Sequence, residues 1–411
     1  MKETSFLEKS KESRFYYGWI VVIASFLMTF MFFSIQYNFG VFSKPLRDEF
    51  GWSRALTSGA FSLYMFVHGF SSILMGTLSD RYDPRITFGV SGFLGGLGMV
   101  LCSQIVDLWQ FYVLFGLLIG VGTGASFSPP MSITAKWFVK RRGLALGIVA
   151  SGIGFGTVIM SPVANYLISA YEWQTAYIIV GFIAWIVLIP AALMIRAVPV
   201  ENNILSYAKN RKESGNVNDE WNTSEAVKTK SLWLVLFSTL LWVLCLQMVM
   251  VHIYDYAIDI DTPSMIAAGV LALIGGSSIL GRLVIGGASD KIGTKRAWLF
   301  CLMCQVAMMF WLTMSKSVLM LYIFAPIFGF TYGGIVPLIP AITGEFFGTK
   351  NLGAIIGFMG LGPTIGGALG PFLAGYIFDV TGSYYSAFLL GVATTILATV
   401  LAIQTKKPER D

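Results

Sequence analysis

Long runs of apolar residues, separated by short polar stretches, fill most of this chain of 411 residues. A helix needs about 20 mainly apolar residues to cross a bilayer, and twelve segments reach roughly this length. The segments cover approximately residues 17–42, 55–79, 86–106, 109–135, 143–169, 174–196, 231–256, 264–289, 296–314, 318–342, 351–378 and 384–404. This pattern predicts an all-α membrane protein with 12 transmembrane helices.

One polar stretch is much longer than the others. Residues 197–230 are rich in Asn, Lys, Glu and Ser and lack apolar periodicity, which is typical of a linker. We therefore expect a six-helix bundle over residues 1–196, a cytoplasmic linker over 197–230 and a second six-helix bundle over 231–411.

Lys and Arg are distributed unevenly between alternate loops. If the N-terminus is inside, the leader, the inner loops and the C-terminal tail hold 23 of the 28 basic residues. The outer loops hold only Lys44, Arg47, Arg54 and Lys316. This asymmetry follows the positive-inside rule, so we expect a multi-pass protein of the cell (plasma) inner membrane with both termini in the cytoplasm. The net charge of +6 thus reflects topology, and we expect no nucleic-acid partner.

The composition excludes several function classes. Only 12% of the residues are charged, whereas a soluble domain carries about a quarter. The four cysteines all lie in apolar segments, so neither a disulfide framework nor a zinc site is expected. We find no H-E-x-x-H, G-x-S-x-G or Walker motif, so we expect no enzyme, metal or cofactor.

A loop motif occurs twice, 210 residues apart. Residues 76–85 (GTLSDRYDPR) and 286–295 (GGASDKIGTK) each combine glycine with an acidic and a basic residue at a helix end. Such a loop can latch one bundle against another on the cytoplasmic side. The motif resembles the signature loop of the major facilitator superfamily, which implies two six-helix bundles and alternating access around a midplane site. The candidate gating residues in the two copies are Asp80, Arg81, Asp290 and Lys291.

Three further motifs indicate a narrower group. Residues 16–19 (YYGW), 51–54 (GWSR) and 136–147 (KWFVKRRGLALG) resemble the monocarboxylate transporter family and its bacterial oxalate–formate antiporter relatives. The resemblance covers essentially the whole chain outside the linker. We expect Arg141 and Arg142 to lie at the inner interface, followed by small residues that let the fifth helix pack tightly.

Arg282 is the strongest candidate for a substrate-binding residue. A basic side chain within a membrane helix is expensive and normally faces a cavity or a partner. Its guanidinium fork matches a carboxylate, and no acidic residue of the same apolar segment lies within a turn or two. The alternatives are an interior salt bridge and snorkelling toward Asp290. The resemblance implies that this arginine binds the substrate carboxylate.

The positions around Arg282 favour a single carboxylate. The eleventh helix has no basic residue, and Met359 stands where the resemblance places the second cation of the oxalate transporter. The animal monocarboxylate transporters have an acid four residues before the arginine for proton coupling, and this chain has Ser278 there. One fixed cation therefore predicts one carboxylate per substrate.

Other candidate binding residues come from the resemblance. Gln36 and Tyr37 match the first helix of the oxalate transporter. Tyr332 matches an aromatic cage position, where its hydroxyl would suit a hydroxy- or keto-acid, and Phe127 replaces a tyrosine of that cage. Helix packing is the alternative for each aromatic residue.

His68, His252 and Asp255 are the candidate proton-coupling residues. A histidine can titrate near neutral pH, and His68 lies one turn after Tyr64. His252 and Asp255 lie near the outer end of the seventh helix. The alternatives are a hydrogen-bonded structural role for His68 and a solvated interfacial position for the other two.

These features predict a secondary transporter in the lipid bilayer. We expect it to carry small monocarboxylate anions, such as lactate or pyruvate, by proton-coupled symport with alternating access. The alternatives are an organic-anion exchanger of oxalate–formate type and a sensor that keeps the transporter fold without transporting.

Overall fold

The computed structural model describes residues 17–138, 142–196, 221–348 and 351–408. All regular elements in these residues are helical. They are α2 (Gly18–Tyr37), α3 (Phe39–Phe50), α4 (Arg54–Arg81), α5 (Pro84–Cys102), α6 (Leu108–Phe111), the π-helical η1 (Tyr112–Ile119), α7 (Gly120–Gly122), α8 (Ser128–Trp137), α9 (Arg142–Met194), α11 (Thr223–Ala226), α12 (Lys230–Asp259), α13 (Ser264–Ile292), α14 (Thr294–Met314), α15 (Val318–Phe347), α16 (Leu352–Met359), α17 (Leu361–Thr381) and α18 (Tyr385–Gln404).

Each of the twelve predicted apolar segments forms helix. Among the described residues, ten helical spans are long and apolar enough to cross a membrane. One of them, α9, contains two predicted segments joined at Glu172, whose φ of 69° breaks the helix. The segment 109–135 is divided among α6, η1, α7 and α8. The predicted all-α membrane fold is therefore confirmed.

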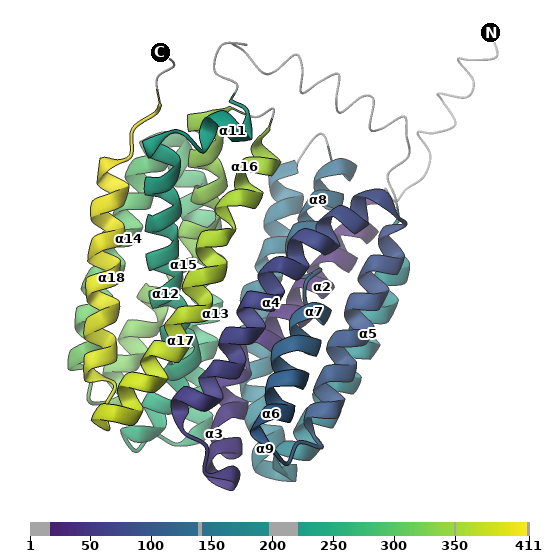
Figure 1. The fold of residues 1–411 in the computed structure, drawn as a ribbon, viewed down its shortest axis with the longest axis vertical. Helices are drawn as coiled ribbons and strands as arrows, with labels where there is room; N and C mark the ends of the chain where they lie inside the picture. The colour runs from purple at the N-terminus through teal and green to yellow at the C-terminus, as the bar shows by residue number, and fades with distance from the viewer. Residues whose placement is uncertain (1–16, 139–141, 197–220, 349–350, 409–411) are drawn as a thin grey trace, which may run out of the picture.

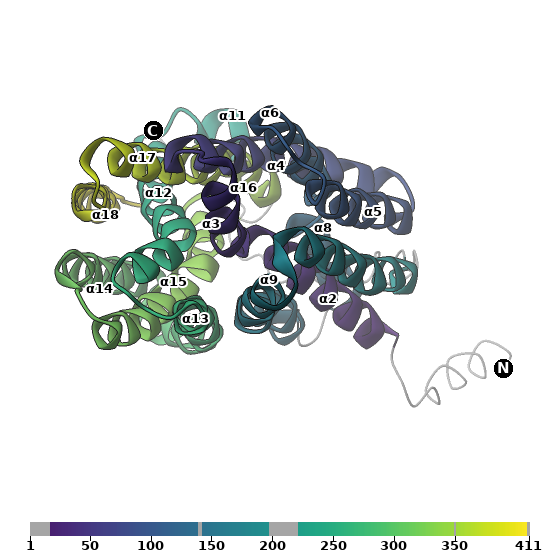
Figure 2. The same ribbon diagram turned by 90° about the horizontal axis from the view of Figure 1, so that it is seen from below.

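The helices form two groups that lie side by side (Figures 1 and 2). We call α2–α9 the N-terminal group and α11–α18 the C-terminal group. In Figure 1 the helices run from an end marked by α11, at the top, to an end marked by α3, at the bottom. Figure 2, seen from the α3 end, places α3 between the two groups.

Glycines allow the same close packing in both groups. A Cβ atom at Gly152 or Gly156 of α9 would lie 2.8 or 2.6 Å from a main-chain oxygen of α2. A Cβ atom at Gly362 or Gly366 of α17 would lie 2.8 or 2.2 Å from a main-chain oxygen of α12. The two pairs are 210 residues apart, so the repeat seen in the loops extends to helix packing.

The two groups also contact each other through equivalent crossings. A Cβ atom at Gly275 of α13 would meet Thr157 of α9 at 2.6 Å, and one at Gly367 of α17 would meet Met65 of α4 at 2.4 Å. An offset of 210 residues converts one pair into the other. The two halves are therefore related by an approximate twofold axis, as in transporters built from repeats.

The predicted gating residues lie mostly outside the described part. Arg141 is outside it, and so are the side chains of Arg142, Asp80, Arg81 and Asp290, although their backbones belong to α9, α4 and α13. Lys291 is exposed in the last turn of α13. The latch at these loops stays a prediction.

The end of the predicted linker packs on the C-terminal group. Residues 197–220 lie outside the described part, whereas residues 221–229 include α11. The Trp221 amide donates to the Phe347 carbonyl at 3.1 Å, and the Asn351 side chain donates to the Trp221 carbonyl at 3.0 Å. These bonds hold α11 against the turn between α15 and α16.

Candidate functional site

Arg282 is a buried cation whose hydrogen bonds go to neutral groups. Arg282 belongs to α13, and only 8% of its surface is exposed. Nη1 donates to Ser278 Oγ at 3.0 Å, Nη2 donates to the Tyr332 hydroxyl at 3.4 Å, and Nε has no partner. No described acidic side chain forms an ion pair with it. The guanidinium charge is therefore not balanced by a described acidic side chain, and Nε can still donate a hydrogen bond to an anion.

Two close helix contacts place these groups together. A Cβ atom at Gly281 would lie 1.9 Å from the Phe330 carbonyl oxygen, and one at Gly333 would lie 2.0 Å from the Ser278 carbonyl oxygen. Helices α13 and α15 can approach this closely only because both positions are glycine. The approach brings Tyr332 of α15 against Arg282.

Tyr37 extends the site into the N-terminal group. It is the last residue of α2, and its hydroxyl lies 3.0 Å from the Tyr332 hydroxyl. Because Tyr332 also accepts a hydrogen bond from Arg282, the three side chains form one polar chain across the two groups. Asn38, at the break between α2 and α3, is buried, and its side-chain amide has no hydrogen-bond partner.

Gln36 and Phe127 contribute less directly. Gln36 Oε1 accepts a hydrogen bond from the Tyr64 hydroxyl at 3.4 Å, so the amide is turned toward α4. Phe127 packs edge-on against Phe33 at 6.4 Å between ring centroids, and Phe33 lies 5.9 Å from the Tyr37 ring. The structure thus links Ser278, Arg282, Tyr332 and Tyr37 by hydrogen bonds, whereas no hydrogen bond joins Gln36 or Phe127 to these four described side chains.

His68 lies in a second polar cluster of the N-terminal group. Its Nδ1 is 3.2 Å from Thr123 Oγ1, and its Nε2 is 3.5 Å from Ser126 Oγ. The ring stacks on Tyr64 with centroids 5.6 Å apart. Thr123 also donates to the Tyr64 hydroxyl, which donates to Gln36. A chain of polar side chains therefore leads from His68 to the residue next to Tyr37.

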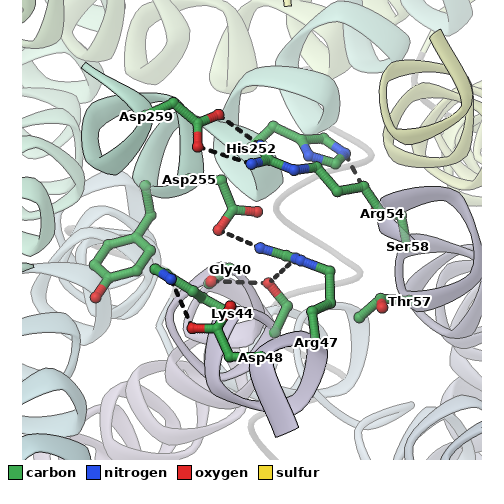
Figure 3. A network of polar contacts seen from close by, with 12 residues as sticks. Gly40, Lys44, Arg47, Asp48, Arg54, Thr57, Ser58, His252, Asp255 and Asp259 are labelled. Atoms are coloured by element: carbon green, nitrogen blue, oxygen red, sulfur yellow. Dashed lines mark hydrogen bonds and ion pairs between the residues drawn. The ribbon is translucent and has the colours of Figure 1, made fainter. Parts of the chain in front are cut away.

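His252 and Asp255 lie among contacts that join the two groups at the α3 end (Figure 3). Asp255 Oδ1 accepts from Arg47 Nη2 at 2.6 Å, and its other oxygen has no partner. His252 Nε2 lies 2.8 Å from the Pro371 carbonyl oxygen, which only accepts, so we assign the ring proton to Nε2. Nδ1 then accepts from the Tyr384 hydroxyl at 2.8 Å. Both candidates are buried, not solvated.

Arg54 makes the most extensive contact at this end. Its guanidinium donates two parallel hydrogen bonds of 2.8 Å to Asp259 and one of 2.7 Å to the Tyr384 hydroxyl. The two oxygens of Asp379 accept from the backbone amides of Arg54 and Ala55 at 2.9 and 2.7 Å. Sequence reasoning placed Arg47 and Arg54 on the outer side but did not identify their partners. The acidic residues near the ends of the seventh and eleventh predicted segments, now in α12 and α17, could have indicated these partners.

Apart from the Tyr37–Tyr332 hydrogen bond, the polar contacts that we describe between the two groups lie at the α3 end. At the α11 end, Arg85 Nε donates to the Ile195 carbonyl at 2.8 Å and Lys295 Nζ donates to the Thr405 carbonyl at 2.6 Å, both within one group. The structure is therefore held closed at the α3 end.

Comparisons with known proteins agree with this architecture. The family model of the Major Facilitator Superfamily matches residues 23–316 and 278–411. Monocarboxylate transporter 12 of Xenopus laevis is 26% identical over 94% of this chain and 88% of that protein. Monocarboxylate transporter 13 of Bos taurus is 27% identical over 92% of this chain and 86% of that protein.

A solved structure supports the same fold. A bacterial homologue of the human lysosomal transporter Spinster, in an inward-facing and unoccupied conformation, has a TM-score of 0.71 and 15% sequence identity. The match covers 94% of this chain and 96% of that one. The relatives named monocarboxylate transporters confirm the motif-based resemblance to that family. Since the family model spans nearly the whole chain, this protein belongs to the Major Facilitator Superfamily and is a multi-pass membrane transporter, not an enzyme.

Proposed function

We propose that this transporter carries small monocarboxylates, of the lactate and pyruvate type, and that Arg282 binds their carboxylate. The observation that carries the proposal is a buried arginine without an acidic partner among the described residues. A buried charge without a counter-ion is strongly unfavourable, so a bound anion would stabilise the site. The tyrosine hydroxyls beside it suit a hydroxyl or keto group next to that carboxylate.

The rest of the site supports a single negative charge on the substrate. Met359, where the resemblance places a second cation, is an uncharged side chain. It is buried, and its sulfur accepts a hydrogen bond from Thr343 Oγ1 at 3.4 Å. The relatives named monocarboxylate transporters are consistent with such a substrate.

We further propose alternating access between two bundles, residues 1–196 and 231–411, joined by the linker 197–230. The positive-inside pattern assigns the α3 end to the outside and both termini to the cytoplasm of a plasma (inner) membrane. With that orientation, the contacts of Arg47 and Arg54 close the outer side of the present conformation. Opening this side requires the carboxylates of the C-terminal group to separate from the arginines.

Uptake by purified protein in proteoliposomes tests the proposal. We expect labelled lactate or pyruvate to accumulate, with competition by other small monocarboxylates. No uptake of any acid in such a panel, by protein that is folded and correctly inserted, would contradict the proposal and favour the sensor alternative.

Proton coupling is the proposed energy source, and His68 is the proposed coupling residue. Histidine is the side chain whose unperturbed pKa lies closest to neutral pH, and the polar chain through Thr123 and Tyr64 connects His68 toward the site. We expect an inward proton gradient to drive accumulation by the wild type and to lose this effect in His68→Gln. The measurement is lactate uptake into vesicles with and without the gradient. Stimulation by internal anion, with no effect of the gradient, would instead indicate an exchanger.

Selectivity should follow the number of charges. Oxalate and succinate should compete weakly with lactate, because their second carboxylate would be desolvated without a cation. Met359→Lys should increase dicarboxylate competition about tenfold, since one charge-assisted hydrogen bond contributes about 1.5–3 kcal/mol. Met359→Leu is the matched control. Strong competition by oxalate in the wild type would contradict the single-charge proposal.

A further inference from the structure

At the α3 end, groups of the N-terminal half bind three carboxylates of the C-terminal group, much as they would bind a free carboxylate ligand. Both oxygens of Asp259 accept from Arg54, and both oxygens of Asp379 accept from backbone amides at the N-terminus of α4. Asp255 accepts from Arg47. A guanidinium fork and a free helix N-terminus are the two protein groups best suited to a carboxylate.

Arg47 and the N-terminus of α4 are positioned by bonds within their own half of the protein, whereas the described side-chain contacts of Arg54 all lie in the C-terminal group. Arg47 Nη1 donates to Ser43 Oγ at 3.0 Å within α3. The first turn of α4 is capped by Ser53, whose Oγ accepts from the Leu56 amide at 3.2 Å. These bonds do not involve the C-terminal group, so they persist when the two groups separate.

We propose that Arg54, Arg47 and the N-terminus of α4 form an entry site for the anionic substrate when the α3 end is open. Asp259, Asp255 and Asp379 occupy this site in the closed state, in place of the substrate carboxylate. The inference rests on the proposed function, because it takes a small carboxylate as the substrate.

The arrangement of charges supports this site (Figure 3). The arginines belong to the N-terminal group, whereas the three aspartates belong to α12 and α17. Lys44, also on the N-terminal side, already has a partner in Asp48 at 2.6 Å. Once the groups separate, an entering anion is attracted to the wall with Arg47 and Arg54 and repelled by the opposite wall. At Arg54, anion binding and closure exclude each other.

A matched pair of variants separates an entry site from a simple closing contact. Arg54→Gln and Asp259→Asn break the same ion pair, but only the first removes the anion receptor. We expect Arg54→Gln to raise the KM for lactate uptake from the α3 side roughly three- to tenfold at low ionic strength. Asp259→Asn should leave KM unchanged or lower it, because Arg54 is then free for the substrate. Arg54→Lys should raise KM less than Arg54→Gln does, because it keeps the charge that attracts the anion but loses the guanidinium fork.

Ionic strength provides the second readout. At about 1 M salt the Debye length falls to about 3 Å, so the KM difference between wild type and Arg54→Gln should shrink. The proposal is overturned if the two variants shift KM in the same direction, if Arg54→Lys behaves like Arg54→Gln, or if salt leaves the difference unchanged. If Arg54→Gln does not insert, Arg54→Met, which also removes the charge, takes its place against Asp259→Asn in the same measurements. Absence of uptake by the wild type would refute the proposed function itself, which distinguishes the two failures.

Discussion

Uptake of monocarboxylate should fall at least about 100-fold when Arg282 is replaced by Gln. The substitution keeps a polar side chain of similar length but removes the only described buried cation at the polar chain of Tyr37 and Tyr332. Hydrogen bonds to charged groups contribute about 1.5–3 kcal/mol each, and two such bonds to a carboxylate account for a loss of this size. Initial rates in proteoliposomes at several substrate concentrations measure it.

Arg282→Lys is expected to recover little of this activity. Lysine keeps the charge but cannot offer two parallel donors to a carboxylate. Lys316→Gln is the control, because that exposed side chain lies just before α15, roughly four helical turns from Tyr332, and carries the same charge. Near wild-type uptake by Arg282→Gln, with normal protein yield, would show that the carboxylate binds elsewhere.

A single added methyl group at Gly333 should have the second largest effect. In Gly333→Ala the Cβ atom would lie 2.0 Å from the Ser278 carbonyl oxygen, so α15 must move away from α13. Overpacking of this kind destabilises a folded protein by about 1–3 kcal/mol. The shift also separates Tyr332 from Arg282, so we expect both lower thermal stability in detergent and strongly reduced uptake.

Gly89→Ala on α5 is the matched control. A Cβ atom there would meet nothing within 4 Å, and alanine favours helix over glycine by up to about 1 kcal/mol. This variant should keep wild-type uptake with equal or higher stability. Equal behaviour of the two variants would mean that the α13–α15 contact is more tolerant than its geometry implies.

Apolar patterning was sufficient to locate the twelve helices, because a lipid bilayer leaves no other partner for most backbone groups than the helix itself. It separated residues 143–169 from 174–196, on either side of Glu172, but it did not reveal the breaks at Asn38 and Gly360. A local break leaves the apolar composition of a segment unchanged, so these breaks follow from packing and backbone conformation.

The candidate site was only partly readable from the sequence. Arg282 was identified because a cation is rare within an apolar segment, and Ser278 lies one helical turn before it. Tyr37 and Tyr332 were identified by resemblance, but their mutual hydrogen bond joins residues 295 positions apart. That contact depends on how α2 and α15 meet, which no local pattern specifies.

By itself, the sequence determined the helices, their grouping into two repeats and the presence of one cation within the membrane-spanning part. These features arise from local composition, helical periodicity and the high energy of a charge in an apolar segment. Only the tertiary structure decided which charges pair at the α3 end, where Arg47 meets Asp255 and Arg54 meets Asp259 across more than 200 residues. Hydrogen bonds and ion pairs act over a few ångströms, so their partners are selected by the packing of the two groups and not by position along the chain.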